Sequence, residues 1–125
     1  MTKISVLVVE DESIVSKDIQ LTLKKLGYEV VGSATTGENA VELALSLEPD
    51  VILMDIHMPG MNGFETTEKI HELGITTPII ALTASDKYEL EGDVFKYKMK
   101  DILVKPFEFI ALQKIIAKHT ELIIN

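Results

Sequence analysis

The stretch PDVILMDIHMPGMNGFE, Pro49 to Glu65, carries the strongest indication of the fold. Its four apolar residues, Val51–Met54, form the short continuous run that is typical of a strand buried on both faces. The run ends directly in a carboxylate, Asp55, and the loop that follows contains a proline and two glycines. Since burying a charge is costly, this arrangement predicts that Asp55 has a task at the end of the strand.

Length and composition predict one domain, residues 1–125, with a core of ordinary size. Hydrophobic residues make up 46% of the chain and charged residues 26%, as in globular proteins that do not enter a membrane. No apolar run approaches the roughly 18 residues of a membrane span, and the start MTKISVLVVEDE lacks the layout of a signal peptide. We therefore expect a cytoplasmic protein with no membrane contact.

The charge pattern narrows the classes of ligand and partner. The formal net charge is −8, and all 12 basic residues are lysine, so the chain has no arginine to bind phosphate or guanine in a bidentate manner. Direct binding of nucleic acid by this chain is therefore not expected. The absence of cysteine excludes disulfides and zinc–thiolate sites.

Apolar runs alternate with segments of helical periodicity along the whole chain. Strands are predicted at Ile4–Val9, Glu29–Ala34, Val51–Met54, Ile79–Leu82 and Ile102–Val104. The short connections predict an α/β fold, in which a five-stranded parallel sheet carries five helices on both faces in a doubly wound arrangement. In such a sheet, binding sites form where loops leave the carboxyl ends of the strands.

The predicted helices are recognised by apolar stripes and by their ends. The stripes are Val15, Ile19, Leu23 and Leu26; Ala40, Val41, Ala44 and Leu45; Leu90, Val94 and Phe95; and Phe107, Ile110, Ala111, Ile115 and Leu122. Gly27 stands where a glycine ends a helix. Two capping pairs, Asn62 with Glu65 and Asp86 with Glu89, predict the starts of the third helix, which runs to about Leu73, and of the fourth.

Five polar side chains are expected at one edge of the sheet, because each follows or ends a predicted strand: Glu10, Asp11, Asp55, Thr83 and Lys105. Two carboxylates about 4 Å apart repel by roughly 4 kcal/mol at an effective dielectric constant of 20, and one lysine cannot neutralise three. A divalent hard cation can, and an all-oxygen site favours Mg²⁺, or Mn²⁺ in its place. A metal, a free carboxylate, a lysine and a hydroxyl suit phosphoryl transfer to an aspartate.

Other phosphate-handling folds fit the sequence less well. A dinucleotide-binding domain needs a glycine-rich first turn, but the first turn here is the acidic VEDES. The GxxxxGK[ST] phosphate-binding loop is absent. Phosphatases of the haloacid-dehalogenase type need a second aspartate two residues after the first, where this chain has His57.

The segments VLVVEDE, DVILMDIHMPGMNG, IIALTA and ILVKPF resemble, in order and spacing, the landmarks of the receiver domain of two-component response regulators. The resemblance covers essentially the whole chain. It implies a flavodoxin-like sheet with the strands, counted along the chain, in the order 2-1-3-4-5. It also implies a phosphoryl acceptor in a His–Asp phosphorelay, which catalyses only its own phosphorylation and slow dephosphorylation and is not otherwise an enzyme.

The resemblance assigns a role to each residue of the expected site. Asp55 is implied as the phospho-acceptor and Asp11 as a direct metal ligand. The resemblance also implies that the metal is bound by Asp55 and by the backbone carbonyl of His57, and through water by Glu10. Thr83 and Lys105 are implied to bind phosphoryl oxygens. The Lys105–Pro106 bond is implied to be cis, and Pro59 and Gly63 to shape the loop after Asp55.

The implied partners are a histidine kinase or a phosphotransfer protein, together with an output partner that the sequence does not identify. The face formed by the fourth helix, fifth strand and fifth helix is implied as a site of homodimerisation. On this face Ile102 replaces a usual aromatic residue, and Lys98 and Met99 replace a small pair. We therefore expect a smaller response to phosphorylation at Tyr97 and Lys100 than beside the acceptor.

Several alternatives stay open from the sequence. A degenerate receiver that acts only as a phosphorylation-independent docking module is the main rival. The sequence is equally compatible with a stand-alone regulator, a relay intermediate and a domain excised from a longer regulator or hybrid kinase. His57 is expected to be an exposed loop residue, and His71 and His119 to be solvated helix residues.

Overall fold

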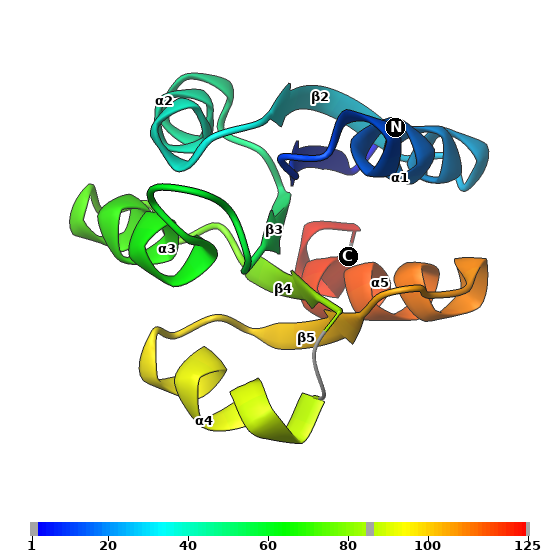
Figure 1. Cartoon of the computed structure of the whole chain (residues 1–125). Helices are drawn as coiled ribbons and strands as arrows, with labels where there is room; N and C mark the ends of the chain where they lie inside the picture. The colour runs from blue at the N-terminus through cyan, green and yellow to red at the C-terminus, as the bar shows by residue number, and fades with distance from the viewer. Residues whose placement is uncertain (1–2, 85–86, 125) are drawn as a thin grey trace.

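The computed structural model describes residues 3–84 and 87–124 and has one central parallel sheet between two layers of helices (Figure 1). The strands are β1 Ser5–Val9, β2 Glu29–Ala34, β3 Val51–Asp55, β4 Ile79–Thr83 and β5 Asp101–Val104. The helices are α1 Ser13–Lys25, α2 Gly37–Leu47, α3 Gly63–Glu72, α4 Lys87–Lys96 and α5 Phe109–Ile124. The strand order is β2-β1-β3-β4-β5, so the predicted doubly wound fold is confirmed.

Pairing within the sheet brings the strand ends to one edge. Val9 of β1 pairs with Met54 of β3, and Asp55 pairs with Leu82 of β4. Every residue of β3 and of β4 is buried, as continuous apolar runs predict for central strands. The residues that end or directly follow β1, β3, β4 and β5 therefore lie together at the carboxyl edge of the sheet.

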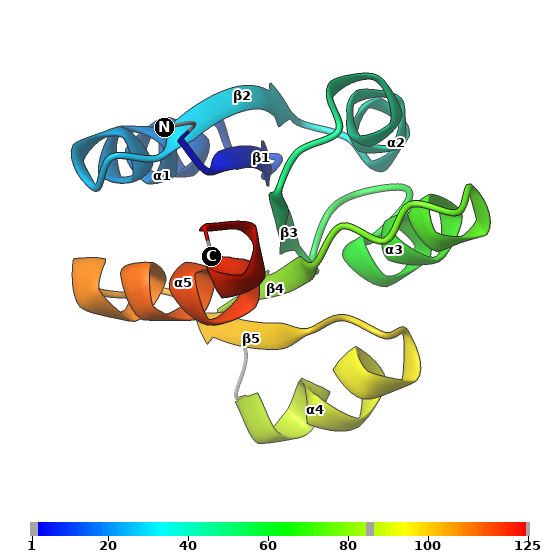
Figure 2. The ribbon, with the colours of Figure 1, turned by 180° about the vertical axis from the view of Figure 1, so that it is seen from behind.

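Each face of the sheet has its own apolar core. Helices α1 and α5 cover one face, and α2, α3 and α4 cover the other (Figures 1 and 2). The first core includes Ile19 and Leu23 of α1 with Leu112 and Ile116 of α5. None of the helices in residues 3–84 and 87–124 is long and apolar enough to cross a membrane.

The helix ends follow the predicted capping signals where the structure describes them. The Asn62 side chain accepts from the Glu65 N–H at 2.9 Å, and the Glu65 carboxylate accepts from the Asn62 N–H at 3.1 Å. This reciprocal capping box starts α3. Gly27 follows the end of α1 with φ of +91°, a value that favours glycine. The capping role expected for Asp86 lies outside the described residues.

Four residues of the expected apolar stripes, Leu45, Phe95, Ile110 and Ala111, are exposed instead of buried, so the stripes were wrong at these positions. Leu45 is 57% exposed, Phe95 66% and Ile110 59%. In the last helix, the expected stripe began at Phe107, but α5 begins at Phe109. The stripe was right at Ile115, which is buried, but it missed the buried Leu112 and Ile116; the side chain of Leu122 is outside the described part.

Candidate active site

The five expected site residues leave the sheet at its carboxyl edge. Asp55 and Thr83 are the last residues of β3 and β4, whereas Glu10 directly follows β1 and Lys105 directly follows β5. Glu10 and Thr83 have no solvent exposure, and Asp55 is 3% exposed. Burial of this many polar groups at one edge marks it as a site of polar chemistry and not as a packing surface.

Three carboxylates converge at this edge. Glu10, Asp11 and Asp55 can each offer one oxygen atom such that the three atoms all lie within 4.8 Å of one another. Asp11 is the most accessible of the three, because it is half-buried while the other two are buried. A set of three carboxylate oxygens has the composition of a site for a hard divalent cation, and so the residues fit the metal that the sequence predicts.

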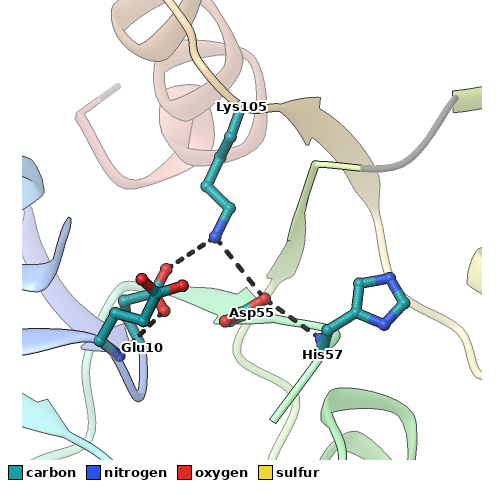
Figure 3. A network of polar contacts seen from close by, with 5 residues as sticks. Glu10, Asp55, His57 and Lys105 are labelled. Carbon is teal, nitrogen blue, oxygen red and sulfur yellow. Dashed lines mark hydrogen bonds and ion pairs between the residues drawn. The ribbon is translucent and has the colours of Figure 1, made fainter.

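Lys105 provides the positive charge that faces these carboxylates (Figure 3). Its ammonium nitrogen lies 2.8 Å from Oε1 of Glu10 and 3.8 Å from Oδ1 of Asp55. The Lys105–Pro106 peptide bond is cis, as expected. The short contact between Lys105 and Glu10 was missed by the sequence reasoning, which assigned each of them a different partner.

Burial and the close charges shift the pKa values in opposite directions. Burial, together with the hydrogen bond and charge of Glu10, raises the pKa of Asp55 to about 8. Burial also tends to raise the pKa of Glu10, but the contacts with Lys105 and Asp55 outweigh it, and the pKa is lowered. Burial lowers the pKa of Lys105, but its bond to Glu10 and the charge of Asp55 outweigh this, and the pKa is raised. Without a cation, the site therefore favours a proton on Asp55 and an ion pair between Glu10 and Lys105.

The loop after β3 is held tightly against the acceptor strand. The His57 N–H donates to Oδ1 of Asp55 at 3.1 Å, while the His57 ring is exposed and points away from the carboxylates (Figure 3). The Gly63 N–H donates to the Ile56 carbonyl at 3.0 Å. A Cβ atom added to Gly63 would lie 2.4 Å from the Asp55 carbonyl oxygen, so only glycine fits there without a shift. The expected role of Gly63 in shaping this loop is confirmed.

The backbone of Thr83 positions the lysine. Its carbonyl oxygen accepts the N–H of Lys105 at 2.7 Å, which joins the ends of β4 and β5. The Glu10 N–H donates in the same manner to the carbonyl of Ala34 at the end of β2. Strand ends thus fix the backbone of both Glu10 and Lys105, and the side chains that meet over Asp55 start from rigid elements.

An apolar groove opens beside Lys105, between α1 and the segment that leads from β5 into α5. It has a volume of about 530 Å³. Its apolar lining includes Ile14, which is 82% exposed, and Phe109, which is 52% exposed. Of the site residues, Lys105 alone is among those that line this groove.

Two histidines differ from the expected solvated state. The His119 side chain of α5 is only 15% exposed, and its Nε2 lies 2.9 Å from Oδ2 of Asp101, the first residue of β5. His71 of α3 is half-buried, and burial with the nearby Lys98 and Lys100 lowers its pKa. The sequence could not predict these contacts, because they depend on how α3 and α5 dock on the sheet.

The doubly wound fold and the carboxyl edge of its sheet define a class of proteins. In this class, an acidic pocket and a lysine surround an aspartate at the end of a strand. The profile of the response regulator receiver domain matches residues 6–117. The chain therefore belongs to the response regulator receiver domain family, whose members are signalling modules and not classical enzymes.

Relatives and solved structures agree with this family. The chain is 37% identical over 103 residues to the chemotaxis protein CheY of Thermotoga maritima, covering 82% of this chain and 86% of that protein. It is 35% identical over 120 residues to the probable C4-dicarboxylate response regulator DctR of Halalkalibacterium halodurans, covering 95% of this chain. It spans only 52% of the length of DctR.

A solved structure with a metal ion is similarly close. It is the receiver domain of the sensor histidine kinase PA1611 of Pseudomonas aeruginosa, with a magnesium ion coordinated in the active site cleft. The two chains are 34% identical with a TM-score of 0.85, and the match covers 96% of this chain and 99% of that one.

Proposed function

We propose that this chain is a phospho-accepting receiver of a two-component phosphorelay, with Asp55 as the acceptor. The observation that carries the proposal is the position of Asp55. It is a buried carboxylate at a strand end, it lies 3.8 Å from the Lys105 ammonium, and Glu10 and Asp11 are beside it. The family membership supports the same function.

The acceptor step follows from these positions. One oxygen of the Asp55 carboxylate attacks the phosphorus of a phosphohistidine on the donor, the new O–P bond forms as the N–P bond breaks, and the electron pair leaves with the histidine nitrogen. Lys105 then moves its ammonium group from Glu10 toward a phosphoryl oxygen. Thr83, at the end of the neighbouring strand, donates a hydrogen bond from its hydroxyl group to another phosphoryl oxygen.

The metal site would be formed by Asp11, Asp55 and the backbone carbonyl of His57, with Glu10 acting through water. The similarity to the magnesium-containing receiver supports Mg²⁺, and Mn²⁺ has the same preference for oxygen ligands. When bound, the ion neutralises the charge that develops on the phosphoryl oxygens. Because cation binding favours ionised ligands, it would also remove the proton that the metal-free site favours on Asp55.

The phosphoryl donor would be the histidine-bearing helix of a kinase or phosphotransfer protein. The apolar groove beside Lys105 supports this partner, because an amphipathic helix can bury apolar side chains against the exposed Ile14 and Phe109 that line it. Phosphorylation would then change the binding of an output partner. The face formed by α4, β5 and α5 is the proposed dimerisation surface.

Incubation with acetyl phosphate and Mg²⁺, followed by intact mass measurement, tests this function. We expect the mass of the wild type to increase by one phosphoryl group. The increase should be absent in EDTA and in Asp55→Asn, and present in Asp93→Asn, a matched change at an exposed aspartate of α4. No incorporation under any of these conditions would instead favour the alternative function, a docking module that works without phosphorylation.

A further inference from the structure

A pocket with a basic wall lies at the edge formed by the amino ends of the strands, at the opposite end of the sheet from Asp55. The loops that lead into β4 and β5 enter the sheet side by side at this edge (Figures 1 and 2). The pocket has a volume of about 290 Å³, and its lining includes His71 near the end of α3 with Lys98 and Lys100 before β5. Three basic side chains from two separate segments therefore line one cavity.

This lining is unusual for so acidic a chain. The chain has 20 acidic and 12 basic residues, yet no residue in the described part of the chain that lines the pocket has a carboxylate. Within residues 3–84 and 87–124, Lys98 and Lys100 form no salt bridge, whereas Lys69, Lys105 and Lys118 do. The positive charge of the pocket is therefore not balanced by a carboxylate in its own wall.

The backbone fixes the positions of both lysines. The Lys100 N–H donates to the Ile79 carbonyl at 2.8 Å, which joins this loop to the start of β4. The Lys98 N–H donates to the Phe95 carbonyl at 3.1 Å, and Lys98 has φ of +63°, in the left-handed region that favours glycine. A lysine at such a position costs conformational energy that glycine does not cost. Its presence in the wall of a pocket therefore favours a role for its side chain.

His71 is close enough to the two lysines to be affected by their charge. Burial lowers the pKa of His71, and the charges of Lys98 and Lys100 lower it further. The charged side chains that line the two pockets on either side of His71 are Glu68, Glu72, Lys96, Lys98 and Lys100. Glu72 lies 3.8 Å from the ammonium nitrogen of Lys69. Because the pKa of His71 is lowered, burial and the lysines outweigh the two carboxylates, and a bound anion would relieve the repulsion.

We propose that His71, Lys98 and Lys100 form a binding site for a phosphate group, either free phosphate or the phosphate of a small organic ester. A tetrahedral dianion can accept hydrogen bonds from two ammonium groups and an imidazole at the same time. Thr76 adds an exposed hydroxyl, and the half-buried Ile75 offers an apolar contact to the organic part of an ester. The site shares no residue with the acceptor edge, so the inference does not depend on the proposed function.

Titration of the full chain with inorganic phosphate in EDTA, at an ionic strength held constant with sodium chloride, tests the site through backbone amide shifts. We expect saturable shifts at His71, Lys98 and Lys100. Lys98→Gln and Lys100→Gln should each weaken binding about fivefold, as the loss of an exposed charge pair implies. Lys114→Gln, at an exposed lysine of α5, is the control and should bind as the wild type does. Shifts that do not saturate, or that occur beside Lys105 alone, would overturn the site.

Titration with phenyl phosphate under the same conditions identifies the source of the phosphate group. Tighter binding than that of inorganic phosphate, with an added shift at Ile75, would assign the site to an organic ester. Equal affinities would assign it to free phosphate. In either case, binding that Lys98→Gln and Lys100→Gln leave unchanged would contradict the proposed site.

Lys98→Gly separates the effect on binding from an effect on folding. It should not destabilise the protein, since glycine suits a φ of +63°. It should nevertheless weaken phosphate binding as much as Lys98→Gln does. Binding as tight as that of the wild type would show that the charge of Lys98 has no role in the pocket.

Sulfate, which carries two negative charges throughout the pH range from 8 to 6, tests the part played by His71. Its affinity should rise as the pH falls, because His71 gains a positive charge, and this rise should be absent in His71→Gln. The double variant Lys98→Gln/Lys100→Gln should raise the pKa of His71 in the absence of sulfate, since it removes two of the charges that lower it. The same pH dependence in wild type and His71→Gln would overturn the assignment of His71 to the site.

Discussion

The Lys105 ammonium nitrogen lies 2.8 Å from Oε1 of Glu10, a carboxylate with no solvent exposure. In this state the lysine neutralises the innermost acid of the cluster and lies farther from Asp55, at 3.8 Å. In this state Lys105 is thus paired with Glu10, a neighbour of the acceptor, and not with the acceptor itself. The stability of the metal-free protein should depend on this pair, and a cation should take over part of its role.

Replacing Lys105 with methionine should destabilise the protein in EDTA by about 3 kcal/mol, since it leaves the buried carboxylate of Glu10 without a counter-charge. Saturating Mg²⁺ should recover a large part of this loss. Urea unfolding with and without Mg²⁺ measures both quantities. Lys114→Met removes an exposed lysine of α5 and serves as the control. An effect of Lys105→Met no larger than that of the control would show that the pair is not important for stability.

Asp11→Asn should stabilise the metal-free protein, because it removes one negative charge from the acidic cluster. The gain should be only about 1 kcal/mol, since water screens the charge of this half-buried residue. The same change should greatly reduce the increase in melting temperature that Mg²⁺ produces by binding the folded state. Glu12→Gln neutralises the next residue, which is exposed, and should keep the Mg²⁺ effect. Equal Mg²⁺ effects in wild type and Asp11→Asn would place the cation elsewhere.

Gly63→Ala should destabilise the fold by about 1–3 kcal/mol, because the added methyl group overlaps the backbone of Asp55 and Ile56. It should also slow phosphorylation, since the acceptor must shift to make room. The matched change Gly92→Ala adds a methyl group to α4, where no atom lies within 4 Å, and should stabilise by about 0.5–1 kcal/mol. Chemical denaturation gives both values, and destabilisation by Gly92→Ala of the same size would contradict the steric explanation.

The contact between Asp101 and His119 should make the stability of the fold depend on pH in the acidic range. Burial tends to raise the pKa of Asp101, but the bond from His119, the Ile102 N–H and the charge of Lys118 outweigh it, and the pKa is lowered. A lowered pKa in the folded state stabilises the protein above the usual aspartate value of about 4 and ceases to do so as the pH falls through the folded value.

Asp101→Asn should therefore cost about 1–2 kcal/mol at pH 7, and the difference from wild type should disappear at low pH. Lys118→Ala removes a 70% exposed partner and should cost less than about 0.5 kcal/mol. Thermal unfolding from pH 3 to 7 measures the two curves. A penalty for Asp101→Asn that is independent of pH would contradict a charged contact.

Continuous apolar runs such as Val51–Met54 were sufficient to predict the sheet, because burial on both faces leaves no alternative pattern. Parallel topology then placed Asp55 and Lys105 at one edge without further information. Helix faces were harder to predict, since Phe95 and Ile110 are apolar yet exposed. In the last helix the predicted stripe included Phe107, which precedes α5, and missed Leu112 and Ile116, which are buried.

Contacts between distant side chains could not be read from the sequence. The pair Glu10 and Lys105 is separated by 95 positions and depends on rotamers that only the assembled edge selects. The same holds for the stacked rings of Phe64 and Tyr97, whose centroids lie 5.1 Å apart. The resemblance to receiver domains also implies that the side chains of His57 and Ser85, two residues after Asp55 and Thr83, affect hydrolysis of the phosphoryl group. Ser85 lies outside the described residues, so this expectation stays a prediction.

The position of the acyl phosphate tests the central claim most directly. After phosphorylation with acetyl phosphate and Mg²⁺, borohydride reduces an aspartyl phosphate to homoserine, which peptide mass mapping then locates. We expect homoserine at position 55 alone, with none in samples treated with EDTA. Homoserine at Asp11 or at another aspartate, or a phosphoryl group that borohydride does not remove, would contradict Asp55 as the acceptor.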